Sequence, residues 1–160
     1  MPRIGKNLAL LASAAALALT GAAATSTTAV GAEAVTDTEL AVMANPVIGS
    51  WQGTVQHQGG SGPISLTFCS SGAVSLHSGG GSGGHGEGTG TWQSTGASTF
   101  KFKVREVLYD TAGNKTGSVD VNQSGKITGN TLNSSGISTI YDVNGNQVGT
   151  AQATITATRV

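Results

Sequence analysis

Apolar and polar residues alternate with a period of two along most of this chain from Ile48 onward. The clearest stretch runs from 98 to 109, where Phe100, Phe102 and Val104 share one face and basic residues share the other. Such alternation is typical of a strand with one face in a core and one in water. Because no stretch in this region has the 3.6-residue apolar spacing of an amphipathic helix, the pattern predicts an all-β fold.

Turn signals divide this region into candidate strands every 8–12 residues or so. The links are short and carry Gly, which adopts the positive φ that tight hairpins need. Short links pair sequence neighbours antiparallel, and closure of the sheet removes the exposed edges of a long meander. We therefore predict an antiparallel up-and-down β-barrel of about eight to nine strands over 47–160. The nine candidate strands are 48–57, 63–69, 73–78, 87–95, 98–109, 115–123, 126–133, 137–143 and 147–158.

The start of the chain has a different character. Arg3 and Lys6 precede an apolar run from 8 to 24 that is rich in Ala and Leu, and small residues follow. This layout is typical of a secretory signal peptide. The run is at the low edge of the length of a membrane-spanning helix. We expect a secreted, extracellular protein with no membrane anchor after cleavage.

Two cleavage positions fit the small residues that follow the apolar run. Ala32-Glu33-Ala34 has the A-x-A arrangement of a cleavage site, which predicts a signal peptide over 1–34. Cleavage after Ala24 is the alternative. Residues 35–46 then form a short leader ahead of the barrel domain.

Charge and cysteine content narrow the class of function. Eight Lys and Arg balance eight Asp and Glu, and charged residues make up 10% of the chain. This balance excludes a nucleic-acid binder that depends on a basic patch. Cys69 is the one cysteine, which excludes a disulfide within the chain; we expect it to be partly covered and inert. The His and acidic residues have no metal-ligand spacing, so we expect no metal and no cofactor.

One nine-residue pattern, Y-D-x-x-G-N-x-x-G, occurs at 109–117 and again at 141–149. Each copy predicts a strand end, a turn started by Asp with Gly in the left-handed region, and a new strand. The pattern fits one hairpin type used twice, with duplication as an alternative. Calcium binding by Asp110 and Asp142 is a further alternative, although one carboxylate per turn is few for that ion.

The two ends of the barrel region resemble a known superfamily. Gly49-Ser50-Trp51 opens the first strand, and Arg159 ends the last one. A Gly-x-Trp with such an Arg resembles the calycin superfamily, which includes lipocalins, fatty-acid-binding proteins and avidins. The resemblance implies that Trp51 closes one end of the barrel, that Arg159 packs across its indole, and that Gly49 allows close backbone approach. The two Tyr-Asp hairpins look similar instead to those of dirigent and allene-oxide-cyclase-type barrels.

Two polar residues fall on predicted inner faces. Continued alternation places Glu106 between Val104 and Leu108, and His57 shares the face of Trp51. A buried carboxylate is costly unless it is paired, hydrogen-bonded or protonated, so Glu106 is a candidate polar anchor or acid–base group. His57 is the second candidate, because a Glu–His pair inside a barrel would form an acid–base dyad. In the alternative, the strand twists near its end and Glu106 pairs with a cation in water.

The other two histidines fall outside the predicted interior. His77 lies on the face opposite Val74 and Leu76, so we expect it in solvent. His85 lies in the Gly-rich stretch 79–88, which predicts a flexible hairpin tip, with a mobile flap over a barrel mouth as the alternative.

Small residues in the last strand indicate either a cavity or a contact surface. If the Ala face turns inward, the barrel has room for a ligand; if the Thr face does, the Ala face packs on a partner. We expect a secreted barrel that binds a small apolar or amphipathic molecule. The alternatives are a cyclase or isomerase with Glu106 as acid–base group, and a filled interaction or inhibitor protein with an extracellular protein partner. Whether the chain is an enzyme stays open. The candidate ligand-binding residues are Glu106, His57, Phe100, Phe102 and Trp92.

Overall fold

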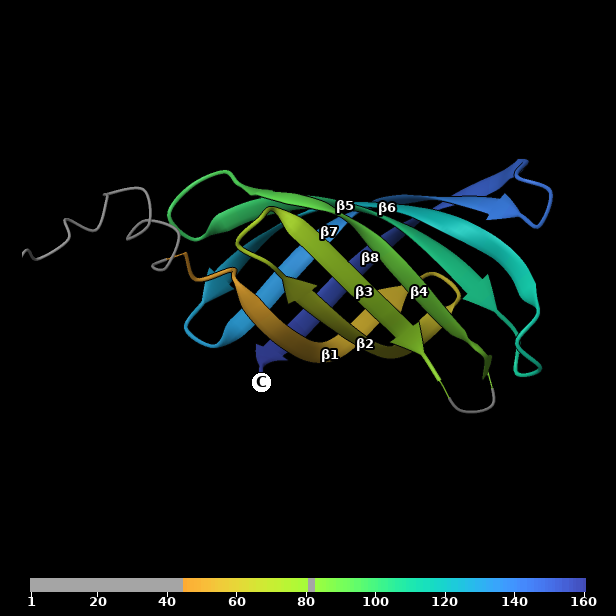
Figure 1. The fold of residues 1–160 in the computed structure, drawn as a ribbon, viewed down its shortest axis with the longest axis horizontal. Coiled ribbons are helices and arrows are strands. Elements are labelled where there is room, and N and C mark those ends of the chain that lie inside the picture. The colour runs from red at the N-terminus through yellow and green to blue at the C-terminus, as the bar shows by residue number, and fades with distance from the viewer. Residues whose placement is uncertain (1–44, 81–82) are drawn as a thin grey trace, which may run out of the picture. The chain divides into compact units, whose positions relative to one another are not determined.

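The computed structural model describes residues 45–80 and 83–160 (Figure 1), so the predicted signal peptide and nearly all of the leader lie outside the described residues. No described helix has the length and apolarity needed to cross a membrane. The described residues form eight strands: β1 (Gly49–His57), β2 (Gly60–Phe68), β3 (Ala73–Gly79), β4 (His85–Ser94), β5 (Thr99–Tyr109), β6 (Lys115–Thr128), β7 (Thr131–Asp142) and β8 (Gln147–Arg159).

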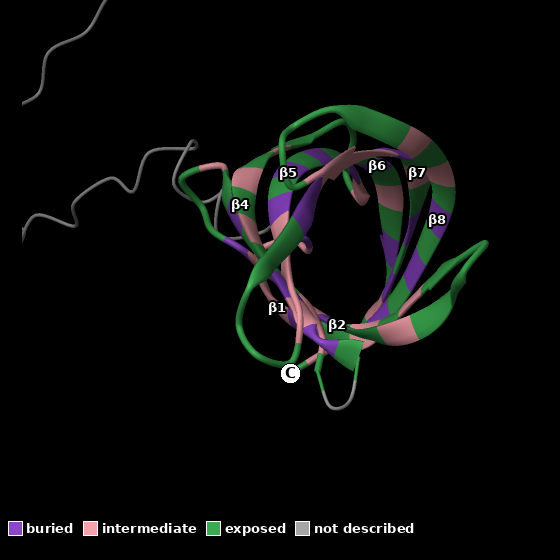
Figure 2. Ribbon diagram, turned by 90° about the vertical axis from the view of Figure 1, so that its right-hand side faces the viewer, coloured by how far each residue is buried: buried purple, intermediate pink, exposed green. Residues whose placement is uncertain are grey.

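The eight strands close into one antiparallel barrel. Each strand pairs with the next one along the chain, and β1 pairs with β8, with Trp51 opposite Arg159 and His57 opposite Ala153. Figure 2 shows the barrel from one end, with the strands surrounding its interior. The predicted fold class, an antiparallel up-and-down barrel, is confirmed.

The two ends of the barrel are named here by residues of β1. The Trp51 end carries the β2–β3, β4–β5 and β6–β7 turns, and the His57 end carries the β1–β2, β3–β4, β5–β6 and β7–β8 turns. The two Tyr-Asp hairpins therefore lie at the same end as His57.

The division of the chain between 115 and 143 differs from the prediction. The sequence predicts three strands there, but the structure has two, β6 and β7. Gly125 and Gly136 lie within these strands rather than in turns, because the backbone approaches other groups closely at both. A Cβ on Gly125 would stand 2.6 Å from Phe100 Cζ. The turn itself is at Gly129, whose φ is +57°.

Alternation in β5 and β8 determines which side chains fill the interior. Phe100, Phe102 and Val104 are buried, and the basic residues between them are exposed, as predicted. In β8 the Ala face turns inward: Ala153 is buried and Thr154 is exposed. The interior wall of this strand is therefore built from small residues.

The repeated hairpin pattern folds into the same turn twice. Asp110 Oδ1 accepts hydrogen bonds from the backbone N–H of Ala112 at 2.9 Å and Asn114 at 2.8 Å, and Asp142 makes the equivalent bonds at 2.9 and 2.8 Å. The central glycines have φ of +83° and +87°. Hydrogen bonds from the Asn residues lower the pKa of both carboxyls.

Candidate functional site

Aromatic side chains fill the Trp51 end of the barrel. The Phe68 ring meets those of Trp92, Phe100 and Phe102 edge-on, with centroids 5.7, 5.4 and 5.7 Å away. The Trp92 indole N–H also donates to the Cys69 carbonyl at 2.8 Å. Phe100, Phe102 and Trp92 thus belong to a packed core, and the structure does not bring them together with Glu106 and His57.

Arg159 covers the indole of Trp51 at this end. Its Cζ lies 4.4 Å from the ring centroid, within cation–π range. Its guanidinium also donates to the carbonyl of Ile48 at 2.8 Å and to that of Pro46. Gly49 has a φ of +131°, and a Cβ there would stand 2.5 Å from Arg159 Nη1. The stacked contact that the sequence resemblance implied is therefore present, and Gly49 makes room for it.

A cavity of about 250 Å³ occupies the His57 half of the barrel. Its wall is mostly apolar and is interrupted by a few polar side chains, as is usual for small-molecule sites. The side chains nearest the Trp51 end are buried, and His57 at the other end is exposed, so the cavity opens at the His57 end. The lining residues are Val55, His57, Ile64, Leu76, Ser78, Glu106, Leu108, Val119, Val121, Gln123, Ser138, Ile140, Ala151, Ala153 and Ile155.

Glu106 turns into this cavity, on the inner face where the alternation of β5 placed it. It is 6% exposed, and the hydroxyl of Ser78 donates a hydrogen bond to its Oε1. Burial raises the pKa of the carboxyl, while the hydrogen bond from Ser78 and the charge of His77 act in the opposite direction.

The contact between Ser78 and Glu106 spans three strands. Ser78 on β3 is opposite Gly86 on β4, and Glu106 is on β5. Any Cβ on Gly86 would overlap the Glu106 carboxylate. The missing side chain therefore lets the hydroxyl reach across β4. Sequence reasoning missed Ser78, because its alternation signal gives a face but not a partner two strands away.

His57 lines the mouth of the same cavity. Its Nδ1 accepts a hydrogen bond from the backbone N–H of Gly59 at 3.1 Å, which leaves the Nε2 position as the donor. In the described part of the chain, no hydrogen bond or ion pair joins His57 to Glu106. The two predicted polar residues share one cavity without forming a direct pair.

Gln123 is a buried polar residue that sequence reasoning missed. The hydroxyl of Ser134 donates to its Oε1 at 2.6 Å, and its Nε2 donates to the Ala153 carbonyl at 3.5 Å. The alternation of β6 could have predicted its inward position, because Gln123 shares one face of the strand with Val119 and Val121. Since both ends of its amide are bonded to protein, Gln123 serves as part of the cavity wall.

The remaining histidines lie on the outside. His77 and His85 stack with ring centroids 5.8 Å apart, and Glu87 Oε1 lies 3.6 Å from His77 Nδ1. His77 is exposed as the pattern indicates, whereas His85 begins β4 instead of lying at a loop tip. Over residues 45–80 and 83–160, no three His, Cys, Asp or Glu side chains form a metal-binding group.

The observed environment of Cys69 differs from the predicted one. The sequence predicts a partly covered thiol, but the residue directly follows β2 at the Trp51 end and is exposed. It lies at the opposite end of the barrel from the cavity.

The fold and site define a class: a closed, eight-stranded antiparallel barrel, packed at one end and hollow at the other. Comparison with protein-family models, with curated proteins and with solved structures finds no match to this chain. The coarser part of the predicted likeness, a barrel of the general calycin type, agrees with the structure.

Proposed function

We propose that this chain is an exported binding protein that holds one small apolar or amphipathic molecule inside its barrel. The observation that carries the proposal is the cavity of about 250 Å³ with a mostly apolar wall and the carboxyl of Glu106. A dry cavity of about 150 Å³ already accepts benzene, so this one has room for a somewhat larger molecule. Glu106 would fix its orientation, and His57 would meet it at the mouth.

The unfilled interior of the barrel supports a binding role over a purely structural one. Apolar surface that stays unfilled in a core costs stability, by about 24 cal/mol for each Å³ of cavity. The inner face of β8 presents Ala151 and Ala153 to the cavity, where larger side chains would fill it. A ligand that occupies this space would recover the lost contacts.

Native mass spectrometry of the mature protein, purified from the culture medium of its own host, is the first test. A mass excess that disappears on denaturation supports a captured small molecule and gives its mass. A bare mass counts against a tight carrier and favours turnover or a protein partner.

A matched pair of variants separates binding from general stability. Ala153→Leu adds bulk inside the cavity, and Thr154→Leu adds bulk on the outer face one residue away. We expect Ala153→Leu to reduce ligand occupancy at least about tenfold, because the added side chain fills the site. Thr154→Leu should retain occupancy. Equal occupancy in both variants would place the ligand outside the barrel.

Turnover by Glu106 is a second candidate, because a carboxyl with a raised pKa inside an apolar cavity suits acid–base chemistry. The substrate would be a small molecule that cyclises or isomerises. If Glu106→Gln keeps binding but stops conversion of the captured molecule, the protein is an enzyme. If conversion continues unchanged, Glu106 has no catalytic role.

A further inference from the structure

Glu106 is the one acidic side chain among the described residues that line the cavity. His57 at the mouth is the other ionisable group of the lining, and no described Lys or Arg lines it. Lys101, Lys103, Lys115 and Lys126 are exposed to solvent, and Arg159 lies over Trp51 at the far end.

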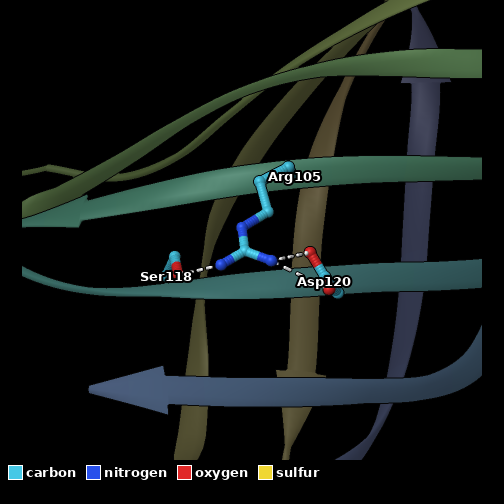
Figure 3. A network of polar contacts seen from close by, with 3 residues as sticks. All are labelled: Arg105, Ser118 and Asp120. Carbon is cyan, nitrogen blue, oxygen red and sulfur yellow. Dashed lines mark hydrogen bonds and ion pairs between the residues drawn. The ribbon is translucent and has the colours of Figure 1, made fainter. Parts of the chain in front are cut away.

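The cation next to Glu106 in the sequence is directed away from it. Arg105 Nη1 lies 2.9 and 3.0 Å from the two carboxylate oxygens of Asp120, and its Nη2 donates to the Ser118 hydroxyl at 3.0 Å (Figure 3). The guanidinium also covers the Tyr141 ring, with Cζ 4.6 Å from the centroid. These contacts hold the charge of Arg105 on the outer face of β5.

Half of the Glu106 carboxyl has no protein partner. Ser78 donates to Oε1, but no donor from the described residues is bonded to Oε2. Since the side chain is 6% exposed and lines the cavity, Oε2 is a hydrogen-bond acceptor available to whatever enters. Because no described buried polar side-chain atom lacks a partner, Oε2 is open to the cavity, and a donor from the ligand would take the place of solvent there.

We propose, on the basis of the binding function above, that the ligand is a compact apolar amine whose ammonium group bonds to Glu106 Oε2. A charge-assisted hydrogen bond is roughly twice as strong as a neutral one, so an alcohol of the same shape binds more weakly. A carboxylate ligand would bring a second negative charge beside Glu106 in an apolar space that no described Lys or Arg lines. The apolar body packs against Ile64, Leu76, Val121 and Ile155.

Three probes with one naphthalene body test this ligand class by isothermal titration calorimetry: 1-naphthylmethylamine, 1-naphthalenemethanol and 1-naphthoate. The amine should bind about tenfold tighter than the alcohol, and the carboxylate should not bind. Glu106→Gln should lower the affinity of the amine to that of the alcohol and leave the alcohol unchanged. Glu87→Gln is the matched control, because it removes a carboxylate on the outer face of β4; the affinities of the amine and the alcohol should be unchanged.

Each other outcome overturns a defined statement. Equal affinities for the three probes, or tightest binding of the carboxylate, would overturn the amine inference and leave the binding function standing. No binding of any probe would overturn both. If Glu106→Gln does not fold, the Cδ resonance of Glu106 in wild-type protein labelled with ¹³C-glutamate replaces it: the amine should shift this resonance, and an unchanged position would overturn the inference.

Discussion

At the scale of single residues, the charge of Glu106 links stability to pH. Burial raises its pKa above the ordinary value of 4.5, so between these two values the folded state binds more protons than the unfolded one. The free energy of unfolding therefore falls as pH rises through this window and levels off above it. Glu106→Gln has no such loss, so its melting temperature relative to wild type should rise between about pH 4 and about pH 8.

Thermal unfolding followed by circular dichroism checks this pH dependence. Thr154→Val is a suitable control, because Thr154 is exposed on the outer face of β8 and carries no ionisable group, so this variant should give curves parallel to wild type. Parallel curves for Glu106→Gln as well would mean that the Glu106 carboxyl is not held in an unfavourable environment.

Arg159 is the second residue whose contacts predict a measurable effect. Arg159→Ala removes a cation–π contact and two charged hydrogen bonds, so it should cost about 2–4 kcal/mol in urea unfolding. Arg159→Lys should restore a minor part, because an ammonium lacks the planar fork that stacks on Trp51 and reaches two carbonyls. Lys126→Ala, at an exposed site, should stay within about 0.5 kcal/mol. Full recovery with Lys would contradict the stacked geometry.

At the scale of elements, the inner face of β4 is shaped by glycines at alternate positions. A Cβ on Gly90 would overlap the Lys103 carbonyl and stand 2.8 Å from Val104 Cα on the neighbouring strand. Gly90→Ala should therefore destabilise the barrel by about 1–3 kcal/mol. Gly62→Ala on β2 is the matched control: no atom lies within 4 Å of its Cβ, so it should be neutral or stabilising by up to about 1 kcal/mol. Chemical denaturation of both variants distinguishes backbone crowding from strand propensity.

The same close approaches explain which elements the sequence predicted well. Alternation located β5 within a residue, because its apolar and basic positions differ strongly. The Ser-Gly pairs at Gly125 and Gly136 instead have the composition of turns. Their glycines make room for Phe100 and for the Asn122 carbonyl on other strands. A local pattern does not distinguish a glycine that bends the chain from one that admits a distant neighbour.

At the scale of the whole molecule, the sequence indicated which side chains face inward but not where each lies along the barrel axis. That position depends on the tilt and stagger of the strands, which couple all eight of them. The inward-facing Phe side chains therefore lie at the Trp51 end, while Glu106 and His57 share a cavity at the other end. The inward position of Glu106 was predictable; its bond with Ser78 required the order of three strands.

This uneven packing predicts uneven local stability. Backbone amides at the packed end, such as that of Phe102, should exchange with deuterium at rates set by global unfolding, whereas those of Val119 and Ile140 beside the cavity should open locally and exchange faster. Native-state hydrogen exchange read by NMR measures both, and a bound ligand should slow the second group. Uniform protection along β6 would mean that the cavity does not weaken its surroundings.

The pairing of β1 with β8 has a consequence for the order of events during biosynthesis. The contact between Trp51 and Arg159 joins segments that are separated by nearly the whole domain, and such distant pairings are slow to form because a long loop must close first. A chain whose β8 is still inside the ribosome has two unpaired sheet edges and an uncovered indole. Completion of the ring must therefore wait until the last strand emerges, and until then both sheet edges can pair with other chains.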